Sequence, residues 1–118
     1  MAHNTNLMLS FFDSTDAVMY LKDAEGRFVL VNRRAAELAG LSKEEFVGKT
    51  AYDIVPKEEA DRVTGIDQKV RKTGTPLNFT DTVTLPSGKK LTLLDHKFPV
   101  SVDGYPNAVG GIAIEIPE

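Results

Sequence analysis

The chain has 118 residues, of which 42% are hydrophobic and 26% charged, and its formal net charge is −3. This length and composition predict one globular domain, and the scattered basic residues argue against a nucleic-acid partner, which requires a basic patch. The sequence contains no cysteine, which excludes disulfides, cysteine nucleophiles, zinc–thiolate sites and cysteinyl cofactor adducts.

The first element in chain order is predicted to be a short amphipathic helix. Within residues 4–13, the large apolar side chains fall on one side of such a helix: Leu7, Met8, Phe11 and Phe12. This stripe requires cover, either from the same domain or from a second copy of the chain. We therefore interpret residues 1–13 as an N-terminal cap and these four residues as candidates for a dimer interface.

A β-hairpin is predicted to follow this helix. Residues 17–22 and 28–31 have the apolar and β-branched character of strands. The turn between them contains Gly26, which takes a positive φ at low cost. A four-residue loop then joins two antiparallel strands.

Helix signals fill the middle of the chain. Asn32 can cap a helix over 33–39, and Ser42 with Glu45 three residues later forms a capping-box pattern. A longer helix is predicted from Pro56 to Thr73, with acidic residues in its first turn and basic residues in its last.

Three strands complete the pattern, over residues 77–85, 90–100 and 108–116. Helices grouped between strand pairs, rather than alternating with strands, predict an antiparallel sheet in an α+β domain. We assign this domain to residues 14–116 and treat 117–118 as a truncated C-terminal linker.

The order of three segments resembles the PAS family of sensory domains. They are "KDAEGRFVLVN", "AAELAGLSKEEFVGKTAYDIV" and "PSGKKLTLLDHKFPVSVDGYPNAVGGIAIEI". The resemblance implies a PAS fold: a five-stranded antiparallel sheet in the order 2-1-5-4-3, with short helices and one longer helix over one face. It also implies a ligand site between sheet and helices, and dimers formed through the N-terminal helix and the outer sheet face.

By the same resemblance, the chain is a sensory module of a larger, bacterial-type signal-transduction protein. It would bind a small ligand, form a homodimer, or do both, to regulate an output domain such as a two-component histidine kinase, a cyclic-nucleotide enzyme or a transcription regulator. Two alternatives remain open: a haem-based gas or redox sensor, and a ligand-free dimerisation scaffold. The isolated domain is predicted to be non-catalytic, because no catalytic triad spacing, phosphate loop or metal-ligand cluster is present.

We also expect a cytoplasmic domain. Its apolar runs are too short to cross a bilayer, and its first residues do not form a signal peptide. The parent protein can still be membrane-anchored.

The candidate site residues depend on which face of the hairpin formed by residues 77–85 and 90–100 points toward the core. A turn at Ser87–Gly88 pairs Leu85 with Lys90 and places one apolar set toward the core: Leu77, Phe79, Asp81, Val83, Leu85, Leu94, His96, Phe98 and Val100. A one-residue slip would invert this assignment.

On that register, Asp81 and His96 lie diagonally across adjacent strands on an apolar face. Three interpretations stay open. Asp81 and His96 can satisfy each other as a structural pair, or they can form the polar end of a ligand pocket. In the third interpretation, His96 is the axial ligand of a haem. The candidate ligand-binding residues are His96, Asp81, Phe79, Phe98, Leu94, Tyr52 and Tyr20, of which the two tyrosines also suit an ordinary core. No metal site is predicted and the cofactor is unknown, apart from the excluded flavin–cysteinyl adduct.

Overall fold

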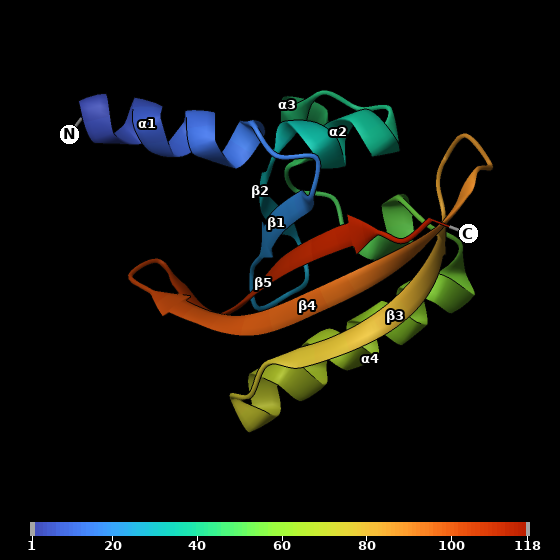
Figure 1. The fold of residues 1–118 in the computed structure, drawn as a ribbon. Coiled ribbons are helices and arrows are strands. Elements are labelled where there is room, and N and C mark those ends of the chain that lie inside the picture. The colour runs from blue at the N-terminus through green and yellow to red at the C-terminus, as the bar shows by residue number, and fades with distance from the viewer. Residues whose placement is uncertain (1, 118) are drawn as a thin grey trace.

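A computed structural model of the chain describes residues 2–117 and shows a curved five-stranded antiparallel sheet (Figure 1). The strands are β1 (Val18–Lys22), β2 (Phe28–Val31), β3 (Leu77–Thr84), β4 (Lys90–Val102) and β5 (Tyr105–Glu115). The helices are α1 (Ala2–Asp13), α2 (Arg33–Ala39), α3 (Lys43–Phe46), the 3₁₀ helix η1 (Ala51–Asp53) and α4 (Lys57–Thr73). The strand order β2-β1-β5-β4-β3 confirms the predicted topology.

The predicted capping signals are confirmed at the helix starts. Ser42 accepts a hydrogen bond from the backbone N–H of Glu45, whose carboxylate accepts one from the Ser42 N–H. Pro56 precedes α4 in an extended conformation, and Gly74 ends the helix with a φ of 66°. Ser42, Glu45 and Gly74 satisfy backbone groups that a helix leaves without partners, whereas Pro56 makes no side-chain capping bond.

Asn32, which caps α2, also joins three parts of the fold. Its side chain is fully buried, and its Oδ1 accepts hydrogen bonds from the N–H groups of Ala35 at 3.0 Å and Met19 at 3.1 Å. Its Nδ2 donates to the carbonyls of Phe12 at 3.0 Å and Ala17 at 2.9 Å. The end of α1, the start of β1 and the first turn of α2 are therefore fixed to one another through a single amide.

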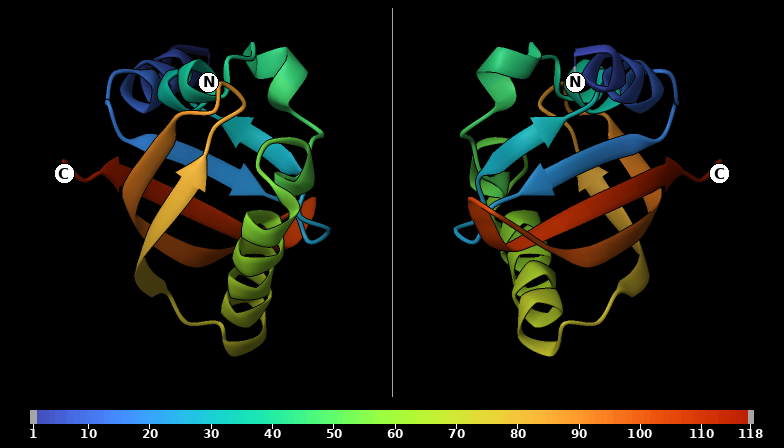
Figure 2. Two further views of the ribbon diagram at one scale, coloured as in Figure 1. Left: turned by 90° about the vertical axis from the view of Figure 1, so that its right-hand side faces the viewer. Right: turned by 90° about the vertical axis from the view of Figure 1, so that its left-hand side faces the viewer.

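The helices after β2 cover the inner face of the sheet. Figure 2 shows α4 lying along this face, with α2 and α3 at the other end of the domain. The core between these layers is divided into small clusters, one of which contains Phe28, Val31, Ala35, Ala39 and Phe46. This division leaves space between the inner face and the helices.

The predicted register of the hairpin formed by β3 and β4 was wrong by one residue. Leu85 pairs with Lys89 rather than Lys90, since the Leu85 N–H donates to the Lys89 carbonyl at 2.8 Å. The turn therefore contains three residues, 86–88, and Gly88 adopts a φ of 90°. Three-residue hairpin loops favour glycine at such a left-handed position, and this turn type shifts the pairing by one residue.

The slip inverts β4 but not β3. Asp81 pairs with Leu93 and Phe79 with Asp95, so the inner face of β4 carries Leu91, Leu93, Asp95 and Lys97. The residues that the predicted register had placed inside β4 lie on the outer face: Leu94, His96, Phe98 and Val100. Because side chains alternate between faces, one residue of shift moves every side chain of the strand.

Helix α1 extends away from the sheet and meets the rest of the domain at its C-terminal end (Figure 1). Three of the four predicted interface residues on it are largely exposed: Leu7 at 63%, Met8 at 70% and Phe11 at 77%. Phe12 is half-buried. An apolar groove runs between this helix and the outer face of the sheet, where Met19 and Leu30 border it. Among the described residues, no helix has the length and apolar character needed to cross a membrane.

Candidate ligand-binding cavity

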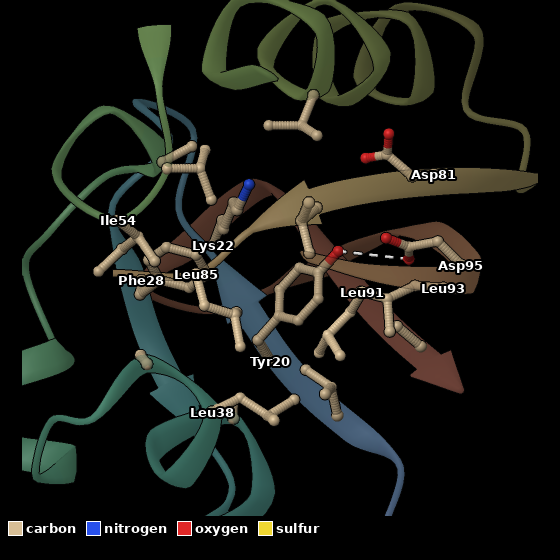
Figure 3. Close-up of a pocket in the computed structure, with 18 of the residues that line it drawn as sticks. Tyr20, Lys22, Phe28, Leu38, Ile54, Asp81, Leu85, Leu91, Leu93 and Asp95 are labelled. Carbon is tan, nitrogen blue, oxygen red and sulfur yellow. Dashed lines mark hydrogen bonds between the residues drawn. The ribbon is translucent and has the colours of Figure 1, made fainter. Parts of the chain in front are cut away.

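A cavity of about 130 Å³ lies between the inner face of the sheet and the helices (Figure 3). Most of its wall is apolar and comes from every layer of the domain, including Val18, Phe28, Leu38, Ile54, Leu91 and Leu93. Five polar or charged residues also line it: Tyr20, Lys22, Asp81, Asp95 and Lys97. The cavity is therefore an apolar space with charged groups in its wall, the combination typical of small-molecule sites.

Tyr20 reaches the charged groups by crossing the central strand β5. The register aligns Tyr20 on β1, Gly111 on β5 and Lys97 on β4 in one row across the sheet. A Cβ atom at position 111 would lie 2.1 Å from Cζ of the Tyr20 ring, so only glycine leaves room for the ring there. The Tyr20 hydroxyl then accepts a hydrogen bond of 2.6 Å from Nζ of Lys97.

Two lysines share one buried carboxylate beneath α4. Asp67 projects from α4 onto the sheet, where its Oδ2 accepts a hydrogen bond of 2.8 Å from Nζ of Lys22, and its Oδ1 lies 2.9 Å from Nζ of Lys97. All three residues are at most 3% exposed. A buried charge is tolerated when it is paired, so this triad fixes α4 to β1 and β4.

The shared carboxylate separates the pKa values of the two lysines. Burial and the nearby charge of Lys97 lower the pKa of Lys22 to about 8, although Asp67 opposes this shift. Burial alone would also lower the pKa of Lys97, but the oxygen of Tyr20 and the carboxylates of Asp67 and Asp95 outweigh burial and raise it. Lys97 is therefore the fixed cation of the cluster, and Lys22 is the one that loses its proton in mildly alkaline solution.

The two aspartates of the cavity wall differ in their partners. Asp81 on β3 forms an ion pair with Arg62 of α4, whose guanidinium also donates to the carbonyl of Thr82 at 3.0 Å. Asp95 on β4 accepts a hydrogen bond from the Tyr20 hydroxyl at 3.5 Å. Burial raises the pKa of Asp95, and the charge of Asp81 raises it further, although the nearby lysines oppose the shift.

The structure brings only two of the predicted ligand-binding residues into the cavity wall, Tyr20 and Asp81. Phe79 shares the inner face of β3 but does not line the cavity. Tyr52 is 48% exposed and donates a hydrogen bond to Asp61 on the surface. Leu94, His96 and Phe98 lie on the outer face, because the pairing of β4 with β3 is shifted by one residue from the predicted register.

His96 does not pair with Asp81. Its Nδ1 contacts Oδ1 of Asn78 on the outer face of the neighbouring strand, and its ring lies 5.5 Å from that of Phe98. Phe98 in turn covers Gly110, just as Tyr20 covers Gly111 on the opposite face. The predicted structural pair was therefore wrong, and His96 is not placed to ligate a haem or any other group inside the cavity.

Sequence reasoning missed the buried charges at Lys22, Asp67, Asp95 and Lys97. A signal for Asp67 exists: it continues the apolar stripe of α4 at helical spacing between Val63 and Val70. Asp95 and Lys97 could be found only with the correct register of β4. Within residues 2–117, no group of three or more His, Cys, Asp or Glu side chains is placed to hold a metal ion.

This chain is similar in sequence to a curated protein and similar in fold to several solved structures. A curated relative, the uncharacterized protein y4lL of Sinorhizobium fredii, is 34% identical over 77 residues, which are 65% of this chain and 9% of that protein. A ligand–DNA complex of Vibrio cholerae VqmA is 23% identical, with a TM-score of 0.83 over 98% of this chain and 53% of that one.

A domain of a Geobacter sulfurreducens sensory box sensor histidine kinase/response regulator is 21% identical, with a TM-score of 0.74 over 95% and 94% of the two chains. These two structures share the fold with this chain. The family model described as "PAS fold" matches residues 12–118. The chain therefore belongs to the PAS fold family.

Proposed function

We propose that this domain is a sensor that binds a small molecule in the cavity between its sheet and its helices. The observation that carries the proposal is an apolar cavity whose wall contains five polar or charged residues. Groups of this kind fix the orientation of a ligand that apolar contacts hold. The volume limits the ligand to about the size of benzene, since a dry cavity of about 150 Å³ accommodates that molecule.

The proposed signal is a shift between two arrangements of α4 and the sheet. Asp67 and Arg62 of α4 contact residues on β1, β3 and β4, three of which line the cavity: Lys22, Asp81 and Lys97. A ligand that contacts these side chains changes the stability of one arrangement relative to the other, which is the requirement for a population shift. The domain would pass this change to an output domain of a longer protein, and by itself it is proposed to be non-catalytic.

Related structures support this proposal. VqmA is described bound to DPO and in complex with ligand and DNA, and other related structures are PAS domains of sensor histidine kinases. Whether this chain regulates a kinase or a transcription regulator stays a prediction, as does its cytoplasmic location.

The cavity proposal is tested with benzene as the probe, by ¹H–¹⁵N NMR titration of the purified domain. We expect amide shifts in the cavity wall. The Ala113→Leu variant should abolish them, because Ala113 lines the cavity and the added carbons fill it. Ile114→Phe is the matched control, since Ile114 is 57% exposed on the outer face. Absence of shifts in the wild type would overturn cavity binding and favour the ligand-free scaffold.

We also propose that the domain forms a homodimer through α1 and the outer sheet face. The groove between them is lined by apolar side chains: Leu7, Met8, Leu9, Phe11, Phe12, Met19 and Leu30. A second copy would cover these side chains, and the VqmA structure is described as a dimer. Light scattering of the wild type should give twice the monomer mass, and the Phe11→Asp variant should give the mass of one monomer. A monomeric wild type at high concentration would contradict this part of the proposal.

A further inference from the structure

One end of the cavity carries an oxygen atom without a hydrogen-bond partner. Both contacts between the Arg62 guanidinium and Asp81 go to Oδ1 of the carboxylate. Oδ2 of the same carboxylate is buried and accepts no hydrogen bond. The side chain is 5% exposed, and Figure 3 shows it between β3 and the overlying helix, at the edge of the cavity. A buried acceptor left in this state destabilises the domain, and a donor brought by a ligand would remove that penalty.

A second carboxyl group lies beside the first. Asp81 pairs with Leu93 and Phe79 with Asp95, so the two aspartates are diagonal neighbours on the inner face. Among the described residues, the Tyr20 hydroxyl is the hydrogen-bond donor to Asp95, and its distance of 3.5 Å is long for a bond between two oxygens. Two carboxylates with spare acceptor capacity therefore line the same cavity.

The charges around the cavity balance one another. Three basic side chains, Lys22, Lys97 and Arg62, contact or approach three acidic ones, Asp67, Asp81 and Asp95. A charged ligand would leave an excess charge in this buried cluster, which is costly in a medium of low dielectric constant. A neutral ligand leaves the balance intact.

We propose that the cavity selects a neutral, single-ring molecule whose N–H or O–H group donates to Asp81, with Asp95 as the second acceptor. This inference rests on the proposed function, and it adds the chemical class of the ligand and the residue that recognises it. The apolar wall accommodates the ring, and the volume of about 130 Å³ admits one ring of five or six atoms. Asp81 then discriminates between donors and non-donors, because a molecule without a donor leaves the buried oxygen unpaired.

Two pairs of molecules with nearly the same shape test this selection. Pyrrole carries an N–H donor and furan does not; phenol carries an O–H donor and fluorobenzene does not. Dissociation constants are measured by ¹H–¹⁵N NMR titration, with the amides of β3 and β4 as the reporters of location. In the wild type, each donor should bind at least about tenfold more tightly than its non-donor partner, the effect expected for a hydrogen bond to a charged acceptor.

Variants locate the acceptor. In Asp81→Asn, Arg62 still donates to the carbonyl oxygen of the amide, and the NH₂ group takes the place of Oδ2. The donor preference, which is the dissociation constant of the non-donor divided by that of the donor, should therefore fall to about one. Asp61→Asn is the matched control, because it makes the same chemical change at an exposed position of α4 outside the cavity. Asp95→Asn should reduce the preference by a smaller factor.

The outcomes separate this inference from the proposed function. If none of the four probes shifts the cavity amides, cavity binding itself fails. If all four bind and furan or fluorobenzene binds as tightly as its partner, the cavity is a binding site but Asp81 does not select donors. This comparison uses the wild type alone, so it decides the question even if Asp81→Asn does not fold. A donor preference that survives in both Asp81→Asn and Asp95→Asn would also overturn the inference.

Discussion

The ring of Tyr20 occupies the space where any other residue at position 111 would carry its Cβ atom, which would lie 2.1 Å from Cζ of the ring. Gly111 thereby allows a side chain from β1 to cross β5 and to meet Lys97 on β4. A glycine inside a strand usually weakens it, because it has no side chain to pack. Here it permits the hydrogen bond that connects the sheet to the charged cluster.

Gly111→Ala is expected to destabilise the domain by about 2 kcal/mol, because the new methyl group forces the Tyr20 ring out of its place. Chemical denaturation measures the change. Gly65→Ala is the control: Gly65 lies in α4 with open space around its Cβ position, so alanine should stabilise the helix by about 0.5–1 kcal/mol. Equal effects of the two substitutions would contradict the crossing geometry.

Substitutions at two adjacent residues of β4 should destabilise the domain to very different extents. Lys97→Met leaves Tyr20 without its donor and Asp67 with one cation instead of two, and should cost about 3 kcal/mol. His96→Ala removes an exposed ring on the outer face and should cost less than about 0.5 kcal/mol. Thermal or urea unfolding distinguishes the two registers, since the one expected from sequence predicts the larger effect at His96.

Asn32→Ala should be among the most destabilising substitutions outside the cavity. It removes the hydrogen bonds to two backbone N–H groups and two carbonyls, at Met19, Ala35, Phe12 and Ala17, and should cost about 3 kcal/mol or more. Asn32→Asp keeps the two accepting contacts but places a buried carboxylate oxygen against the carbonyls of Phe12 and Ala17, so it should not restore the stability of the wild type. Asn78→Ala, an exposed residue of the outer face, serves as the control in the same denaturation series.

Stability should depend on pH through Lys22. Its pKa in the folded domain is about 8, below the 10.5 of an unperturbed lysine, because burial and Lys97 oppose its charge more than Asp67 favours it. Between about pH 8 and pH 10 the unfolded chain therefore binds more protons than the folded one at this site, and the contribution of Lys22 to stability rises with pH. The Tyr20 ring, 5.5 Å from Nζ of Lys22, and Asp95 also lie near this group, and Lys97 keeps its proton throughout the window.

The measurement is the free energy of unfolding of the wild type minus that of Lys22→Met, at each pH from 7 to 10. This difference should be constant below about pH 8 and should then rise by an amount on the order of 2 kcal/mol by pH 10. Lys89→Met changes an exposed lysine and controls for the loss of a surface charge. A difference that falls with pH would show that the charged form of Lys22 is the favoured one.

Local sequence signals were sufficient for the elements and their order. The capping box at Ser42 and Glu45, the cap at Asn32 and the glycine after α4 act within a few residues of themselves, so their effect does not depend on distant parts of the chain. The strand order was implied by the family resemblance and is confirmed. Tyr20 and Asp81 were predicted near a ligand and do line the cavity.

Only the tertiary structure decided which face of β4 meets the helices. One additional residue in the 86–88 turn moved His96 outside and Lys97 inside, since alternation along a strand converts a shift of one residue into an exchange of faces. The partners of the buried charges were likewise beyond the sequence. Lys22, Asp67 and Lys97 are separated by 45 and 30 positions along the chain, and no local pattern relates them. Their pairing arises from packing α4 against the sheet, where a buried charge is stable only beside an opposite one.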